Sequence, residues 1–208
     1  MIFVITGAPF SGKNTMALAM LHSERKLKQV SITSTSRACS NVCEVEANHK
    51  YMELQEFAER KANKEFVGTM HYCDAEHGVL KTDLDAVLSS GATAIMLVNP
   101  NIARQLGFYF RELSIKAACI YMHCSIRSML FRLAEAKGKY GVCDYETIHD
   151  IYADHAIFYS NMHRDSEKGE GYVRVMPVNS DKLTGINYPE KTMDPVFRVM
   201  QNLESVVK

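Results

Sequence analysis

The residues with the clearest capacity for chemistry lie in segment 7–15, Gly7-Ala8-Pro9-Phe10-Ser11-Gly12-Lys13-Asn14-Thr15. Its two glycines let the backbone curl so that several N–H groups converge on one anion. An apolar run precedes the segment and a stretch with helical spacing follows it, which gives the order strand, loop, helix. The following helix would add the partial positive charge of its N-terminus. The segment therefore predicts a phosphate-binding loop that binds ATP through Gly7, Ala8, Ser11, Gly12, Lys13, Asn14 and Thr15.

The lysine of this loop would reach the β- and γ-phosphates, but the residue after it departs from the strict pattern. A Ser or Thr hydroxyl normally follows the lysine and holds magnesium, whereas here Asn14 follows and Thr15 comes one residue later. The string resembles the loops of adenylate and related nucleoside monophosphate kinases, and this resemblance implies that Thr15 and bound water help to hold Mg²⁺. A second interpretation stays open: Asn14, in place of the usual Ser or Thr, is a sign of weakened catalysis.

A second informative stretch, 31–37, reads Ser31-Ile32-Thr33-Ser34-Thr35-Ser36-Arg37. It places hydroxyls and one arginine at the end of a predicted core strand, and ligands of open α/β sheets bind outside such strand ends. The planar guanidinium of Arg37 could hold a monophosphate through two parallel hydrogen bonds. We therefore expect Ser34 and Arg37 to bind a phosphorylated acceptor.

The composition is that of an ordinary globular protein of 208 residues, with 24 basic and 24 acidic residues and no net charge. This balance argues against a nucleic-acid or membrane-surface partner. No apolar run is long enough to cross a membrane, and no signal peptide is visible. The six cysteines lack the paired spacing of a zinc site, so we expect reduced thiols and a cytoplasmic protein. The oligomeric state stays open, a homodimer included.

Strand-like and helical stretches alternate along the chain, which predicts βα units around a parallel sheet. The expected strands are 2–6, 28–33, 92–98, 117–122 and 172–178. The expected helices are 13–24, 53–62, 82–89, 101–112, 125–137, 145–162 and 194–206, and Gly91 is typical of a residue that ends a helix. The segment 36–80 is a long excursion with short elements of its own.

Taken together, the order and spacing of these features resemble the guanylate kinase family over roughly residues 1–183. Ser34 to Arg37 stand where that family has a Ser/Thr run ending in a phosphate-binding arginine, and Tyr51 stands where a tyrosine contacts the acceptor phosphate. His77-Gly78 fits a Tyr-Gly step. The resemblance further implies that Arg132 is a phosphate-facing lid arginine, acting in catalysis with Lys13 and Arg37, and that Asn179 lies beside the adenine of ATP.

The sequence also departs from the family at positions that read guanine. A glutamate would fall at about Gly68 and a hydroxyl at Val79, while Leu97 and Asn99 replace an acidic pair at a strand end; Asn99 then remains as an acceptor-binding candidate. Ser40 replaces a second phosphate-binding arginine, and the far lid helix has no arginine at Asp150, Asp154 and His155. Since a site that reads a base by hydrogen bonds discriminates strongly, we expect an acceptor other than GMP.

The resemblance implies one α/β domain of the P-loop kinase type, with three layers and a parallel central sheet. Its core would comprise 1–35, 92–124 and 172–208, its NMP-binding insertion 36–80 and its lid 125–162. The implied activity is transfer of the γ-phosphoryl group of ATP to a small-molecule (deoxy)nucleoside monophosphate. Two alternatives stay open: a weakly active or inactive guanylate-kinase-like binding module, and a P-loop kinase that phosphorylates a non-nucleotide phosphate.

Overall fold

The computed structural model describes residues 1–8, 10–22, 26–36, 49–72, 74–140, 145–172, 174–183 and 201. Five strands form a parallel sheet in the order β2-β7-β1-β8-β9. These strands are β1 (Ile2–Gly7), β2 (Leu27–Gln29), β7 (Thr93–Leu97), β8 (Ala117–His123) and β9 (Arg174–Asn179). After β1 the chain continues to one side of the sheet, and later it returns to the other side with β8. The carboxyl end of β1 is therefore the switch point at which open α/β sheets bind ligands.

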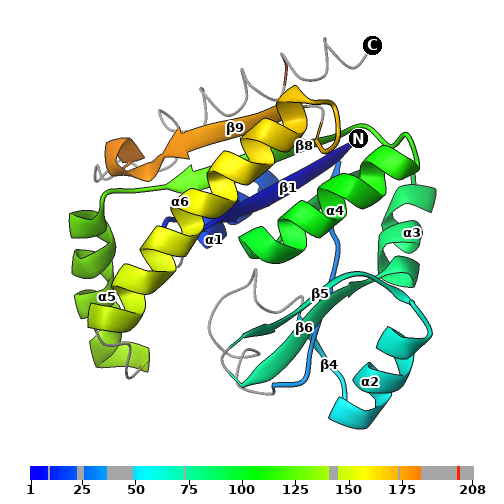
Figure 1. Ribbon diagram of the computed structural model, residues 1–208, viewed down its shortest axis with the longest axis horizontal. Coiled ribbons are helices and arrows are strands. Elements are labelled where there is room, and N and C mark those ends of the chain that lie inside the picture. The colour runs from blue at the N-terminus through cyan, green and yellow to red at the C-terminus, as the bar shows by residue number, and fades with distance from the viewer. Residues whose placement is uncertain are drawn as a thin grey trace.

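Helices cover both faces of this sheet (Figure 1). Helix α1 (Lys13–Leu21) packs on one face, where Met16 and Met20 contact the side of β1 that carries Phe3 and Ile5. On the other face α4 (Pro100–Glu112) and α6 (Tyr145–Glu167) cover Ile2 and Val4. Because alternate residues of a strand point to opposite faces, burial of both faces explains the unbroken apolar run of β1. The three-layer α/β architecture predicted from the sequence is confirmed.

A second, smaller sheet has the strand order β4-β3-β6-β5. It consists of β3 (Ile32–Ser34), β4 (His49–Tyr51), β5 (Phe66–Tyr72) and β6 (Ala75–Leu80), with β3 and β4 parallel and the other neighbours antiparallel. Helix α2 (Leu54–Ala62) packs on one of its faces, where the Phe57 and Phe66 rings stack 4.4 Å apart. Helix α3 (Lys81–Ser89) then leads back to β7 and ends before Gly91, whose φ of 68° fits the predicted helix stop.

The prediction of one strand over 28–33 is wrong, because this stretch contributes to two sheets. Residues 27–29 pair with β7 in the parallel sheet, and residues 32–34 pair with β4 and β6 in the small sheet. Val30, fully buried, marks the crossing between them and still bonds to Ile95 of β7. The stretch mixes polar and apolar residues as a strand does, but such a pattern carries no information about which strand each residue pairs with.

The other predicted elements agree with the structure within a few residues, although α6 runs to Glu167 rather than 162. Helix α5 (Ile126–Tyr140) precedes α6, and a short helical turn, Ser180–Leu183, follows β9. The predicted helix over 194–206 lies outside the described residues apart from residue 201. Among the helices that the structure describes, none combines the length and apolar character needed to span a membrane.

Candidate functional site

The loop between β1 and α1 has the backbone that its glycines predict. Gly7 has a φ of 137°, and a Cβ at this position would lie 2.0 Å from the carbonyl oxygen of Met122, so only glycine fits. Gly12 has a φ of 90° and precedes the first residue of α1. The loop therefore curls at the carboxyl end of the central strand and leads directly into a helix N-terminus, the arrangement that favours an anion.

Lys13 folds back over this loop. Its Nζ donates a hydrogen bond of 2.8 Å to the carbonyl oxygen of Ala8, which also accepts the Ser11 N–H over 3.2 Å. Burial lowers the pKa of the Lys13 ammonium to about 8, and the nearby Cys124 thiol opposes that shift. A phosphate bound in the loop would supply the negative charge that a half-buried ammonium lacks.

The hydroxyl groups of Ser11 and Thr15, both predicted to bind ATP, lie in different surroundings. Ser11 Oγ is buried and has no hydrogen-bond partner within the described part of the chain, so it is an orphaned polar atom inside the loop. Thr15, the predicted metal residue, is exposed on the first turn of α1, and Asn14 beside it is half-buried. Mg²⁺ in nucleotide sites is held largely by phosphate oxygens and water, so an exposed hydroxyl beside the loop fits that ion. The described residues contain no cluster of three or more His, Cys, Asp or Glu side chains that could hold a metal ion.

Arg132 of α5 lies against the same loop. Its Nη1 donates to the carbonyl oxygen of Phe10 over 2.8 Å and to Ser180 Oγ over 2.9 Å, and its Nη2 donates to the Ser180 carbonyl oxygen over 3.2 Å. Asn179, predicted beside adenine, accepts the Asp181 N–H through its side-chain oxygen. Arg132, Asn179 and the loop, far apart in sequence, are thus brought to one end of the parallel sheet.

The predicted acceptor residues lie on the small sheet. Ser34 is buried, and its Oγ accepts the Ser36 N–H over 3.1 Å. Tyr51 of β4 and His77 of β6 are its cross-strand neighbours, and Tyr51 is exposed. Arg37 lies outside the described residues, so its predicted role remains a prediction. Asn99 is the N-cap residue of α4, where its Oδ1 accepts the Ile102 N–H over 3.0 Å.

Sequence reasoning did not assign a role to His49. It lies two residues before Tyr51 on β4 and so on the same sheet face, with its ring centroid 6.5 Å from that of His77. Its Nδ1 is buried without a hydrogen-bond partner among the described residues. Burial, and to a lesser degree His77, lowers the pKa of His49. The two histidines are 28 residues apart in sequence and come together only because β4 and β6 both pair with β3, so no local pattern predicts their contact.

The two positions that would read guanine are packed into the protein. A Cβ on Gly68 would lie 3.2 Å from the Cβ of Gln105 on α4, and Val79 is fully buried in the main core. Neither position presents a carboxylate or hydroxyl to a ligand. The expectation of an acceptor other than GMP stays a prediction.

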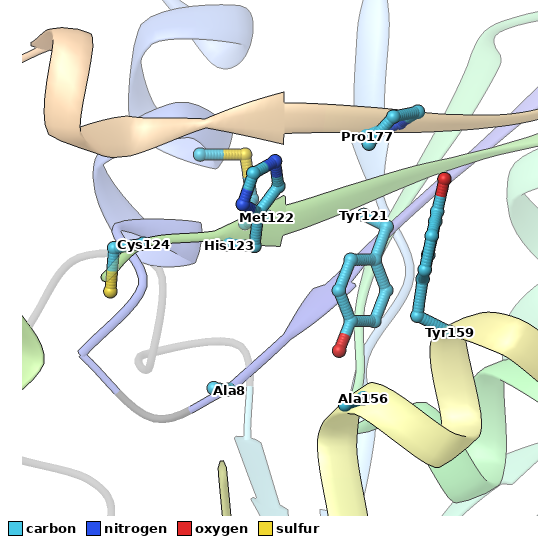
Figure 2. A pocket seen from close by; sticks show the side chains of 8 residues that line it. All are labelled: Ala8, Tyr121, Met122, His123, Cys124, Ala156, Tyr159 and Pro177. Atoms are coloured by element: carbon cyan, nitrogen blue, oxygen red, sulfur yellow. The ribbon is translucent and has the colours of Figure 1, made fainter. Parts of the chain in front are cut away.

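A cavity of about 190 Å³ adjoins the phosphate loop on the side of α6 (Figure 2). Its largely apolar lining includes Ala8 of the loop, Tyr121, His123 and Cys124 at the end of β8, and Tyr159 of α6. The Tyr121 and Tyr159 rings lie 4.7 Å apart. The cavity therefore offers aromatic surface directly beside the first loop residue.

Comparison with solved structures shows which known fold this chain resembles. Guanylate kinase from Anaplasma phagocytophilum superposes with a TM-score of 0.55 at 14% sequence identity, covering 97% of this chain and 85% of that one. The protein has the guanylate kinase-like fold of P-loop kinases. A chain of the Pnkp1/Rnl/Hen1 RNA repair complex also matches, with a TM-score of 0.49, 12% identity and coverage of 77% and 45% of the two chains. No family model and no curated protein matches the sequence.

Within this guanylate kinase-like fold, the loop with Lys13 occupies the switch point of the parallel sheet, and the small sheet carries Ser34 and Tyr51. A loop of this kind would bind a phosphate through backbone N–H groups, which depend on the two glycines and the strand–helix order more than on particular side chains.

Proposed function

We propose that the protein is an ATP-dependent (deoxy)nucleoside monophosphate kinase that does not depend on guanine. The observation that carries this proposal is the curled loop at the carboxyl end of β1, with Lys13 folded over it and Gly7 packed so closely on Met122 that no other residue fits. An intact phosphate loop favours an enzyme over a module that only binds a partner.

The donor ATP would lie with its phosphates in the loop. Backbone N–H groups and Lys13 would hold the β- and γ-phosphates, and the residues near Thr15 would lie beside the bound Mg²⁺. When present, that ion neutralises charge on the phosphates. The pKa of Lys13, about 8 without a ligand, would rise next to a phosphate, so that the bound state is fully cationic.

The acceptor monophosphate would be held on the small sheet, by Ser34, Tyr51 and Arg37. An oxygen of its phosphate attacks the γ-phosphorus as the bond to the β-γ bridging oxygen breaks. Phosphoryl transfer asks the protein mainly for alignment and charge stabilisation, so holding the two phosphates in line is the principal task of these residues. Gly68 and Val79 carry neither the carboxylate nor the hydroxyl that would restrict the acceptor to GMP, and both are buried.

The direct test is ADP formation from Mg-ATP with a panel of ribo- and deoxyribonucleoside monophosphates, including base-modified pyrimidines. We expect turnover with at least one acceptor other than GMP. Lys13→Ala should abolish it with the fold intact, whereas Lys28→Ala, which changes an exposed lysine on β2, should not. Absence of ADP with every nucleotide, together with retained ATP binding, would favour a binding module or a non-nucleotide acceptor.

A further inference from the structure

Phe10 holds an unusual backbone conformation in the middle of the phosphate loop. Its φ of 59° lies in the left-handed region, which non-glycine residues rarely adopt because the Cβ approaches the following carbonyl. No glycine is present here to adopt it freely, so contacts from outside the loop must stabilise it.

Helix α5 supplies these contacts in two ways. The Phe10 side chain packs against a small apolar cluster in which Met129 of α5 joins Ala8 of the loop and Cys124 after β8. On the same helix, Arg132 Nη1 donates a hydrogen bond to the Phe10 carbonyl oxygen over 2.8 Å. The helix thus holds both the side chain and the backbone of the same residue.

Ser180 connects this contact to the other side of the loop. It is buried, it accepts two hydrogen bonds from Arg132, and a Cβ on Gly12 would lie 3.6 Å from its Cβ. The adjacent Asp181 accepts the Ser125 N–H over 2.7 Å, just before α5 begins. The loop, the end of β9 and the start of α5 are therefore joined in one network with Arg132 at its centre.

The directions of these bonds define what Arg132 does. Both hydrogens of its Nη1 go to protein acceptors, Phe10 O and Ser180 Oγ, so this nitrogen is committed to the loop and not to a ligand. A planar peptide bond couples the Phe10 carbonyl to the Ser11 N–H, so holding the carbonyl also fixes the direction of that N–H. The Ser11 N–H in turn closes the turn by bonding to Ala8 O over 3.2 Å.

We propose that Arg132 is a positioning residue of the phosphate loop, which it holds in its binding conformation through the Phe10 carbonyl and Ser180. This role differs from the charge on the transferring phosphoryl group that the family resemblance implies. It rests on the proposed function only in that the loop binds ATP. A positioning role changes donor affinity, whereas a charge that acts on the transferring group changes the rate of the chemical step.

The test separates these two effects with Arg132→Met, Arg132→Lys and Ser180→Ala. Calorimetry would measure the Kd of Mg-ATP, and steady-state kinetics would measure kcat and the KM for ATP. We expect Arg132→Met to raise Kd and KM about tenfold or more and to lower kcat by less than about threefold. Arg132→Lys, with one donor group in place of the fork, should be intermediate, and Ser180→Ala should shift in the same direction but less.

Two further measurements guard against a general loss of structure. Arg111→Met, at the exposed C-terminal end of α4, is the matched arginine control and should leave Kd unchanged. The chain contains no tryptophan, so Phe10→Trp introduces a single tryptophan in the loop, whose fluorescence can be excited separately from that of the tyrosines. Its emission should shift to longer wavelength when Arg132→Met is added, because α5 would then no longer hold the loop and the indole would become more exposed to water.

The outcomes distinguish the inference from the proposed function. A fall in kcat of about a hundredfold with Kd and KM for ATP unchanged would overturn the inference, because Arg132 would then act on the transferring group. A weaker Kd in Arg132→Met would support it even if the parent protein phosphorylated no nucleoside monophosphate. If the parent protein failed to bind Mg-ATP at millimolar concentration, both proposals would fall. If Arg132→Met did not fold, Arg132→Lys and Ser180→Ala would decide the question.

Discussion

Gln105 of α4 hydrogen-bonds both backbone polar groups of Thr69 in β5. The Thr69 N–H donates to its Oε1 over 3.1 Å, and its Nε2 donates to the Thr69 carbonyl oxygen over 2.9 Å. The amide therefore replaces a neighbouring strand at this point of β5 and fastens the small sheet to the helix that covers the parallel sheet.

Removing this amide should loosen the attachment of the small sheet. Gln105→Ala leaves the Thr69 N–H and C=O without their partner, and we expect a loss of about 1–3 kcal/mol in the free energy of unfolding. Urea denaturation would measure it. Gln105→Glu keeps the acceptor but loses the donor, so it should lie between the parent and the alanine variant. Asn101→Ala, which removes only a side-chain contact of Gln105, is the control; an equal loss there would argue against the Thr69 bonds as the cause.

Restoring a carboxylate at the guanine-reading position should not restore guanine preference. The site of Gly68 is closed by Gln105, since even a Cβ would lie 3.2 Å from the Cβ of that residue. We expect Gly68→Glu to cost about 1–3 kcal/mol of stability through overpacking and to leave the ratio of kcat/KM for GMP to other acceptors unchanged. Gly68→Ala should be milder. A stable Gly68→Glu variant with a new GMP preference would show that the position opens to the acceptor.

Lys13 should make stability depend on pH in the alkaline range. Its pKa is about 8 in the folded protein and near 10.5 when exposed. Between these values the unfolded chain binds more protons at Lys13, so the free energy of unfolding should rise with pH across this window. In Lys13→Met this contribution is absent. The measurement is urea unfolding without nucleotide at several pH values between about 7.5 and 10, with Lys28→Met as the exposed control. Identical slopes in Lys13→Met and the parent would contradict the lowered pKa.

The lowered pKa of His49 should also make the free energy of unfolding rise with pH, but in the acidic range. Its pKa lies below the usual 6.5 because of burial and the neighbouring His77. As the pH falls below about 6.5, the unfolded chain takes up a proton that folded His49 resists, so stability is lost. His49→Gln should lose less stability than the parent between about pH 7.5 and 5 in thermal or urea unfolding. His22→Gln changes an exposed histidine and should behave like the parent. A parent-like acid dependence in His49→Gln would show that other groups control it.

Several features could be predicted from the sequence because their causes are local. The run from Ile2 to Ile5 is apolar at every position, which indicates a strand buried on both faces, and β1 is such a strand. Gly7 and Gly12 marked the loop because their backbone conformations are difficult for any other residue. The helix stop at Gly91 has the same cause.

Features that depend on long-range pairing could not be predicted in this way. The stretch 28–33 reads as one strand in sequence, but its halves pair with strands of different sheets. The neighbours of Ser34, from β4 and β6, are likewise chosen by strand register. Strand register is fixed by contacts between segments that are distant in sequence, and the spacing of residues within one segment does not predict those contacts.

Arg132 illustrates where the two kinds of information meet. The resemblance to the guanylate kinase family implied a phosphate-facing arginine at this position, and the guanidinium lies against the loop, at the Phe10 carbonyl oxygen. Which groups it bonds to, the Phe10 carbonyl and Ser180, was decided by the tertiary structure. A side chain's location follows from the element that carries it, whereas its hydrogen-bond partners follow from which backbone groups the folded chain leaves facing it.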